Sequence, residues 1–195
     1  SCRLLTLIGQ GGIGKTRLAI EAAREQIGVF ADGVFFIPLN TVTRCDQLPV
    51  AIAEGIGINL LPREDPQTQL CHALSAKSML LVLDTMEQLA SGALCLSEIL
   101  SCSPHLVLLA TSQSRLNLQE EWVYLVEGMQ VPQEGCSNLD ELLRCNAAEF
   151  FVNTARRVGY STPLDATSCR AVSQICRLVE GTPLSLELAA SACRV

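Results

Sequence analysis

Short apolar runs alternate with helix-like segments along the first two thirds of the chain. Runs that contain few polar residues and end at glycine or at polar side chains are typical of buried strands. They predict strands over residues 4–8, 33–39, 78–84, 105–113 and 121–129. Apolar residues at helical spacing predict helices over residues 15–26, 47–57, 68–74 and 85–100. The alternation predicts an α/β fold with a mainly parallel sheet that helices cover on both faces.

The pattern changes after Gln133, beyond which the sequence predicts helices and no strand. Ser137 and Asp140 stand at the spacing of a capping box, and Thr182 followed by Pro183 is a typical helix start. The predicted helices cover residues 137–143, 146–158, 165–180 and 182–192. We therefore expect an α/β domain of residues 1–133 and a small all-helical subdomain of residues 134–195.

The overall composition narrows the class of protein. The chain has 195 residues, of which 49% are apolar and 17% charged, and its net charge is −6. No apolar run approaches the roughly 18 residues of a membrane span, so we expect no membrane partner. Because Lys and Arg form no cluster, this segment is not expected to bind nucleic acid directly.

Ten cysteines leave two interpretations open. Their even number permits disulfides, whereas Cys169 and Cys176 occupy core-like positions of a helical pattern, as buried reduced thiols do. No two of the ten form a CxxC pair, so a zinc or thioredoxin-type site has no support. No signal peptide is visible. We favour reduced thiols in a cytoplasmic protein.

The stretch GQGGIGKT, from Gly9 to Thr16, matches the pattern G-x-x-x-x-G-K-[ST] between a predicted strand and a predicted helix. Glycines let backbone N–H groups curve around a phosphate, and the helix N-terminus adds a positive potential. Lys15 supplies a cation for phosphate oxygens, and the hydroxyl of Thr16 suits Mg²⁺. The predicted binding residues are Gly9, Gly11, Gly12, Ile13, Gly14, Lys15, Thr16 and Arg17. The alternative is a glycine-rich turn with a chance lysine.

A carboxylate that holds the metal is expected at the end of the apolar run MLLVLD. Asp84 ends that run, so it is expected at the carboxyl edge of the sheet, where open α/β sheets bind ligands. Its alternative role is to cap the following helix. Hydrolysis also needs an acid near the terminal phosphate, and Thr85 occupies the position directly after Asp84. Glu87, expected in the first turn of the next helix, is a candidate catalytic acid or a residue that favours the helix N-terminus.

The chain resembles the nucleotide-binding core of STAND NTPases, which are related to the NB-ARC and NACHT groups. It is most similar in kind to the ATPase segments of LuxR- and AfsR-type bacterial regulators. Four stretches in order carry the resemblance: LLTLIGQGGIGKTRLAIEAA, LLVLDTMEQL, LLATSQSRLNLQEEWVYLV and LVEGTPLSLELAA. The first is generic to P-loop proteins, and the last distinguishes this family.

The resemblance implies a role for each motif. Gly9–Thr16 would be the Walker A loop and Asp84 the Walker B acid, binding ATP or ADP with Mg²⁺ through Thr16 and Asp84. Thr111 and Ser112 would occupy the sensor position near the γ-phosphate. Pro183 in GTPL would lie against the nucleotide base, or would simply start a helix.

Two departures from the family pattern bear on hydrolysis. Relatives commonly carry arginine after the Thr-Ser pair, where this chain has Gln113, with Arg115 two residues further on. Thr85 stands where asparagine or aspartate is usual. Both changes lower the charge available around a γ-phosphate, so we expect at most weak ATPase activity.

These features predict a signalling switch that exchanges ADP for ATP within a larger regulator of transcription. The effector and sensor domains and a winged-helix lid would lie outside this segment, and activation would involve a homo-oligomer. A small-molecule P-loop kinase is one alternative, although no arginine-rich lid is visible. A degenerate scaffold that binds nucleotide weakly or not at all is another.

Overall fold

The computed structural model describes residues 2–89, 93–161 and 163–193. Contacts divide the chain into two units. The first comprises Ser1–Gln10 and Lys15–Val126, and the second comprises Gly11–Gly14 and Glu127–Val195. The predicted domain boundary lies at Gln133, whereas the first unit ends at Val126, one residue after the last strand.

The first unit is built on a five-stranded sheet in which every neighbouring pair of strands is parallel. The strands are β1 (Leu4–Ile8), β2 (Val34–Pro38), β3 (Leu80–Asp84), β4 (Val107–Ser112) and β5 (Glu121–Leu125). Their order across the sheet is β2-β3-β4-β1-β5. The prediction of an α/β fold with a covered, mainly parallel sheet is confirmed.

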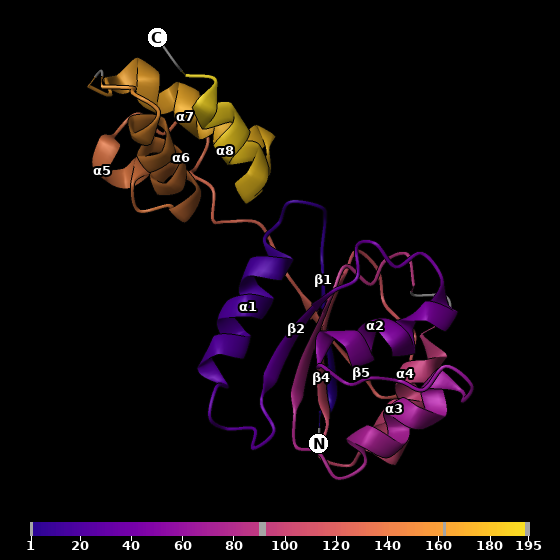
Figure 1. The fold of residues 1–195 in the computed structure, drawn as a ribbon. Coiled ribbons are helices and arrows are strands. Elements are labelled where there is room, and N and C mark those ends of the chain that lie inside the picture. The colour runs from indigo at the N-terminus through magenta and orange to yellow at the C-terminus, as the bar shows by residue number, and fades with distance from the viewer. Residues whose placement is uncertain (1, 90–92, 162, 194–195) are drawn as a thin grey trace. The chain divides into compact units, whose positions relative to one another are not determined.

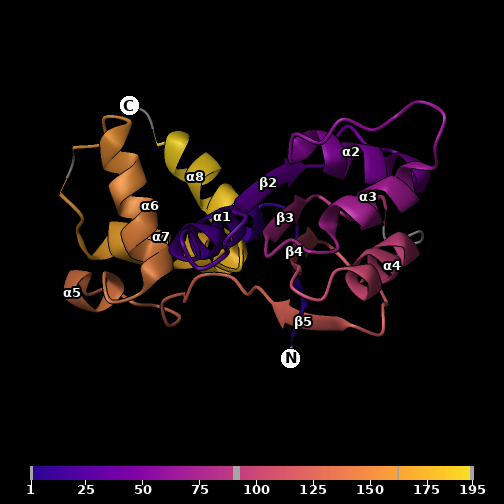
Figure 2. The same cartoon turned by 60° about the horizontal axis from the view of Figure 1, so that its bottom comes forward.

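Helices cover both faces of this sheet. They are α1 (Lys15–Glu25), the short 3₁₀ helix η1 (Cys45–Gln47), α2 (Leu48–Gly55), α3 (Pro66–Leu74) and α4 (Leu94–Cys102). Figures 1 and 2 show α1 on one face and α2, α3 and α4 on the other. Each face has its own apolar cluster, and all five residues of β3 are buried because both faces cover them. This double burial explains why the strands are continuous apolar runs.

Two local predictions differ from the structure. The helix expected directly after Asp84 begins only at Leu94, and Glu87 lies in a turn rather than in a first helical turn. The predicted residues 90–92 of this helix lie outside the described residues. The N-cap of α5 is Asn138 rather than Ser137, because the side chain of Asn138 accepts hydrogen bonds from the backbone N–H groups of Asp140 and Glu141.

In its described residues, the second unit contains helices and no strand. They are α5 (Leu139–Leu142), α6 (Asn146–Arg157), α7 (Ala166–Leu178) and α8 (Pro183–Ser191). Helix α6 packs against α7 and α8, and α5 contacts α7. Asp165 caps α7 by accepting a hydrogen bond from Ser168 N at 2.8 Å, whereas Thr182 precedes α8 without a side-chain cap. Within the described residues, no helix is both long and apolar enough to cross a membrane.

The cysteines only partly follow the expectation of buried thiols. Cys136, Cys169 and Cys176 are buried free thiols in the apolar core of the second unit. Cys2 and Cys102 are free thiols as well, but they are exposed. Burial raises the pKa of the Cys176 thiol to about 11.

Candidate functional site

The loop between β1 and α1 carries the glycines of the predicted phosphate cradle. Gly12 and Gly14 have φ angles of 78° and 103°, in a region that L residues with side chains rarely adopt. The backbone geometry at these two positions therefore favours glycine. Ile13 between them is buried, and Arg17 in the first turn of α1 is exposed.

Lys15 begins α1 and turns its side chain back toward the start of the loop. Its Nζ donates hydrogen bonds to Gly9 O at 2.8 Å and to Gln10 O at 2.9 Å. The ammonium group is thus held beside the loop backbone by two carbonyl oxygens. An anion that attracted it more strongly would have to compete with these two bonds.

Asp84 lies at the centre of a network of hydroxyl groups at the carboxyl end of β3. Thr16 Oγ1 donates to Asp84 Oδ1 at 2.7 Å, and Thr111 Oγ1 donates to the same oxygen at 2.7 Å. Asp84 is 9% exposed and Thr111 only 2%, so the carboxylate is largely withdrawn from water. A helix and two strands that are far apart in sequence thereby meet at one oxygen atom.

The pleat of the sheet explains this meeting. Side chains two residues apart along a strand share a face, so Asp84 lies on the face of Val82, and Thr111 on that of Leu109. Val82 and Leu109 both belong to the apolar cluster under α1. Thr16 lies in the first turn of α1, so its hydroxyl reaches the carboxylate from the same side.

Ser112 follows Thr111 on β4 and has a different environment. As the next residue along a strand, it points to the opposite face of the sheet. Its Oγ accepts a hydrogen bond from Ser114 N at 3.3 Å. Only Thr111 of the predicted sensor pair therefore contacts Asp84.

Thr85 has an unusual backbone conformation directly after Asp84. Its φ angle is 70°, which is a genuine outlier for a β-branched residue. Its backbone N–H donates to Thr111 Oγ1 at 2.9 Å, and its own hydroxyl lies 3.4 Å from Asp84 Oδ2. The Thr111 hydroxyl therefore accepts a hydrogen bond from the Thr85 N–H and donates one to Asp84, so it links these two neighbouring residues. The sequence does not predict this role of Thr85, because no local pattern indicates a positive φ at a threonine.

Glu87 and Gln113 form a second polar pair beyond the ends of β3 and β4. Gln113 Nε2 donates to Glu87 Oε1 at 3.4 Å. Glu87 Oε2 is buried and, within the described residues, has no hydrogen-bond partner. A buried carboxylate oxygen without a hydrogen-bond donor lowers the stability of the folded protein unless water, an ion or a ligand contacts it. Glu87 thus carries an acceptor that the described protein atoms do not use.

The donor set at Asp84 fits Mg²⁺. This ion prefers hard oxygen ligands and usually binds through one or two protein oxygens together with phosphates and water. Thr16 offers a hydroxyl and Asp84 a carboxylate, and both oxygens lie together where α1 begins and β3 ends. Because the Thr16 hydroxyl donates its hydrogen bond to Asp84, the lone pairs of the hydroxyl oxygen stay available for a cation.

Pro183, the predicted base-contacting residue, belongs to the second unit, where it is the first residue of α8. A proline at this position is favoured because its missing N–H would have no partner inside the helix. This explains Pro183 structurally, and its role toward a nucleotide stays a prediction, as does that of Arg17.

No family model matches the chain. A "putative HTH-type transcriptional regulator" of Mycobacterium tuberculosis is 32% identical over 193 residues, which make up 98% of this chain and 20% of the regulator. An "uncharacterized protein" of the same species is 32% identical over 190 residues, or 97% of this chain and 45% of that protein. The chain therefore spans about a fifth of one relative and less than half of the other.

Two solved structures share the architecture. One is a Signal Transduction ATPase with Numerous Domains (STAND) protein with a tetratricopeptide repeat sensor from Pyrococcus horikoshii. It has a TM-score of 0.54 and 14% identity, covering 97% of this chain and 28% of that one. The other is a chain of Drosophila ORC bound to DNA, with a TM-score of 0.60 and 13% identity, covering 98% of this chain and 55% of that one. The chain shares the α/β fold of these structures, built on a parallel five-stranded sheet. At these identities the likeness concerns the fold alone.

Proposed function

We propose that this chain is the ATP- and ADP-binding switch domain of a larger regulator, with slow or no ATP hydrolysis. The observation that carries the proposal is the meeting of Thr16, Asp84 and Thr111 at one carboxylate oxygen beside the loop of Lys15. A purely structural turn would not need a buried carboxylate that accepts hydrogen bonds from two hydroxyl groups at the carboxyl ends of the strands. A Mg²⁺–nucleotide site needs this arrangement.

Each residue has a distinct task in this proposal. The N–H groups of Gly9–Gly14 and the N-terminus of α1 bind the phosphates. Lys15 leaves the carbonyl oxygens of Gly9 and Gln10 and binds the terminal phosphates. Thr16 and Asp84 hold Mg²⁺, which neutralises phosphate charge when it is bound. Thr111 fixes the orientation of the Asp84 carboxylate.

Slow hydrolysis follows from the same residues. Thr85 has no acidic group, and Gln113 is neutral where an arginine would stabilise charge that develops on the phosphate. Glu87, held by Gln113, is the acid available to accept a proton from water in this proposal. A site that binds well and turns over slowly suits a switch whose state depends on the bound nucleotide.

The proposal places the output in other domains. The mycobacterial relative with an HTH-type name is about five times longer than the matched segment, which supports a multidomain regulator of transcription. We propose that sensor and effector domains, a winged-helix lid and a homo-oligomer formed on activation complete the switch in the cytoplasm. This segment, with a net charge of −6, would not bind nucleic acid itself.

One observation favours a second candidate, a scaffold that has lost nucleotide binding. The Lys15 ammonium group is already engaged by two carbonyl oxygens, and Gln113 brings no charge. If those bonds persisted, the loop would be a structural turn. This candidate predicts that removing Lys15 changes no binding property of the chain.

Calorimetric titration of the chain with ADP and with ATP, each with and without Mg²⁺, tests the proposal. Lys15 and Lys77 are the two lysines of the sequence, so Lys77→Ala is a matched control for Lys15→Ala. Lys77 pairs with Asp32 at 2.8 Å, away from the carboxyl ends of the strands. The switch predicts Mg²⁺-dependent binding that is lost in Lys15→Ala and kept in Lys77→Ala. A wild-type chain that binds neither nucleotide would refute it.

A further inference from the structure

Helices α3 and α4 lie side by side on the face of the sheet opposite α1 (Figures 1 and 2). Each of them leads into a strand of the same parallel sheet, so the two helices run in the same direction. The side chain of Gln67 on α3 joins them. Its Nε2 donates hydrogen bonds to Cys95 O at 2.9 Å and to Glu98 Oε2 at 3.2 Å. Gln67 and Glu98 therefore face each other across the two helices.

One turn beyond this contact, each helix carries a cysteine. Residues four apart lie on the same face of a helix, so Cys71 follows Gln67 along the facing side of α3. Cys102 follows Glu98 in the same way at the end of α4. The spacing on the two helices thus brings the two thiols together. Burial and a hydrogen bond with the Cys102 thiol raise the pKa of Cys71 to about 11.

The two thiols differ in their access to solvent. Cys102 is exposed, whereas Cys71 is half-buried, so a small solute reaches the pair from the side of Cys102. Helix α4 ends at Cys102, shortly before β4 begins at Val107. The pair therefore lies at the amino ends of the strands, away from Asp84 at the carboxyl end of β3.

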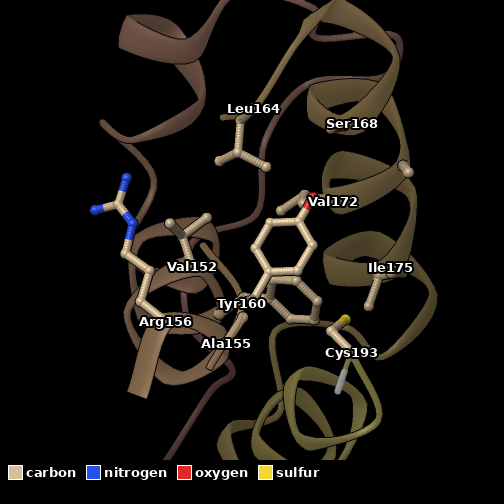
Figure 3. A pocket seen from close by; sticks show the side chains of 11 residues that line it. Val152, Ala155, Arg156, Tyr160, Leu164, Ser168, Val172, Ile175 and Cys193 are labelled. Carbon is tan, nitrogen blue, oxygen red and sulfur yellow. The ribbon is translucent and has the colours of Figure 1, made fainter. Parts of the chain in front are cut away.

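Two other accessible cysteines have different neighbours. Cys193 borders an apolar cavity of the second unit, and the other described residues that line this cavity include no cysteine (Figure 3). Its Sγ donates a hydrogen bond to Ala189 O at 3.6 Å. The exposed Cys2 likewise donates to Leu4 O at 3.7 Å. These thiols contact backbone carbonyl groups, whereas the thiols on α3 and α4 contact each other.

We propose that Cys71 and Cys102 are a peroxide-reactive pair that closes to a disulfide between α3 and α4. The Cys102 thiolate attacks hydrogen peroxide, an S–O bond forms, the O–O bond breaks, and hydroxide leaves and takes up a proton. Cys71 then attacks the sulfur of the sulfenic acid. The S–S bond forms, the S–O bond breaks, and water leaves with the proton of Cys71. Two thiols are oxidised, and one peroxide is reduced to two waters.

The disulfide would be a reversible modification. Disulfides of cytosolic proteins are usually transient and sense the redox state, and a thiol reductant restores both cysteines. The segment between the two cysteines contains β3, so the crosslink would close a loop around a central strand of the sheet. Because the pair lies apart from the proposed nucleotide site, its oxidation needs no bound nucleotide.

The test treats the reduced 195-residue chain with equimolar hydrogen peroxide, without nucleotide, and then blocks the remaining thiols with iodoacetamide. Trypsin and a glutamate-specific protease digest the product without reductant. Cleavage after Glu98 separates Cys95 from Cys102, so the partner of each can be identified by mass spectrometry. We expect a crosslinked pair of peptides that contains Cys71 and Cys102 and that dithiothreitol separates.

Four variants make the test specific. Cys71→Ser and Cys102→Ser should both lose the crosslink. Dimedone, which traps sulfenic acids, should label Cys102 in Cys71→Ser and should not label Cys71 in Cys102→Ser, because Cys102 reacts first. Cys95→Ser, on the same helix, and Cys2→Ser, which removes another exposed thiol, should form the crosslink as the wild type does.

Urea unfolding of each reduced variant shows whether it is folded before peroxide is added. A wild-type chain in which peroxide converts Cys102 to sulfinic acid without linking it to Cys71 would overturn the proposal. So would a disulfide that joins Cys102 to a different cysteine or to a second chain, or a dimedone adduct on Cys71 in Cys102→Ser.

Discussion

The Thr111 hydroxyl donates a hydrogen bond to Asp84 Oδ1 at 2.7 Å, across two neighbouring parallel strands. The same hydroxyl accepts the backbone N–H of Thr85 at 2.9 Å. Thr111 is therefore the connection between the acid and the turn that follows it. Because it is almost completely buried, water does not readily replace either bond.

Replacing Thr111 with valine keeps the shape of the side chain and removes both bonds. We expect the free energy of unfolding to fall by about 1–3 kcal/mol, because the Thr85 N–H and the Asp84 carboxylate each lose a partner. We also expect the gain in ADP affinity on adding Mg²⁺ to shrink, since Asp84 is no longer held in place. Urea unfolding and ADP titration with and without Mg²⁺ measure the two effects.

Ser112→Ala is the matched control for Thr111→Val, because Ser112 is equally buried on the same strand and its hydroxyl bonds only Ser114 among the described residues. It should lower stability and leave the Mg²⁺ effect on ADP binding intact. A Thr111→Val variant with an unchanged Mg²⁺ effect would show that Thr111 does not position Asp84.

Thr85→Gly should be more stable than Thr85→Ala. Both substitutions remove the hydroxyl, but only glycine adopts a φ of 70° without a steric penalty. The left-handed conformation costs other residues about 1–2 kcal/mol, so we expect a difference of about 1 kcal/mol after the entropy of glycine is counted. Parallel urea unfolding curves give the difference, and equal stabilities would refute a strained Thr85.

Features that depend on local pattern could be predicted from the sequence. The apolar runs that became β1 to β4 lie within a few residues of their predicted places, because burial on both faces leaves a strong pattern. The pairing of Asp84 with Thr16 was also predictable, since parallel strands bring their carboxyl ends to one edge and α1 starts there.

Features that depend on tertiary contacts could not be predicted. The positive φ of Thr85 goes together with a bond from its N–H to Thr111, which is 26 residues away in sequence. The different roles of Thr111 and Ser112 depend on which face of the sheet α1 covers, and this cannot be predicted from the local sequence. The helix predicted after Asp84 begins at Leu94 instead, because helical periodicity does not reveal the turn that contains Glu87.

Any ATP hydrolysis by the chain is expected to depend on Glu87. Glu87→Gln keeps the hydrogen-bonding shape but removes the basic carboxylate whose Oε2 is buried without a partner in the described residues. Loss of a general base typically lowers a rate by about 10²–10⁴-fold, so phosphate release should fall by about that factor while ADP affinity is kept. Glu64→Gln, at an exposed loop acid, is the control, and wild-type turnover in Glu87→Gln would exclude Glu87 as the base.

The Cys176 thiol should resist alkylation until the second unit unfolds. Burial raises its pKa to about 11, so at pH 8 only roughly one thiol in a thousand is ionised. Iodoacetamide followed by peptide mass spectrometry should label the exposed Cys2 and Cys102 first. Early labelling of Cys176 in the folded chain would contradict its burial.

The same shift makes stability depend on pH in the alkaline range. The folded-state pKa lies above the ordinary value of 9.0, so the contribution to stability is complete below that pH. It is lost as the pH rises toward 11, because the unfolded thiol ionises first. Urea unfolding at several pH values should show this loss in the wild type and a smaller one in Cys176→Ala.

The nucleotide that the purified chain carries is the first thing to identify, by denaturing the protein and separating the released molecules chromatographically. A switch that holds ADP predicts about one ADP per chain in the wild type and in Lys77→Ala, and none in Lys15→Ala. An empty wild-type site that also fails to bind added ADP or ATP with Mg²⁺ would contradict the switch and leave the loop of Lys15 as a structural turn.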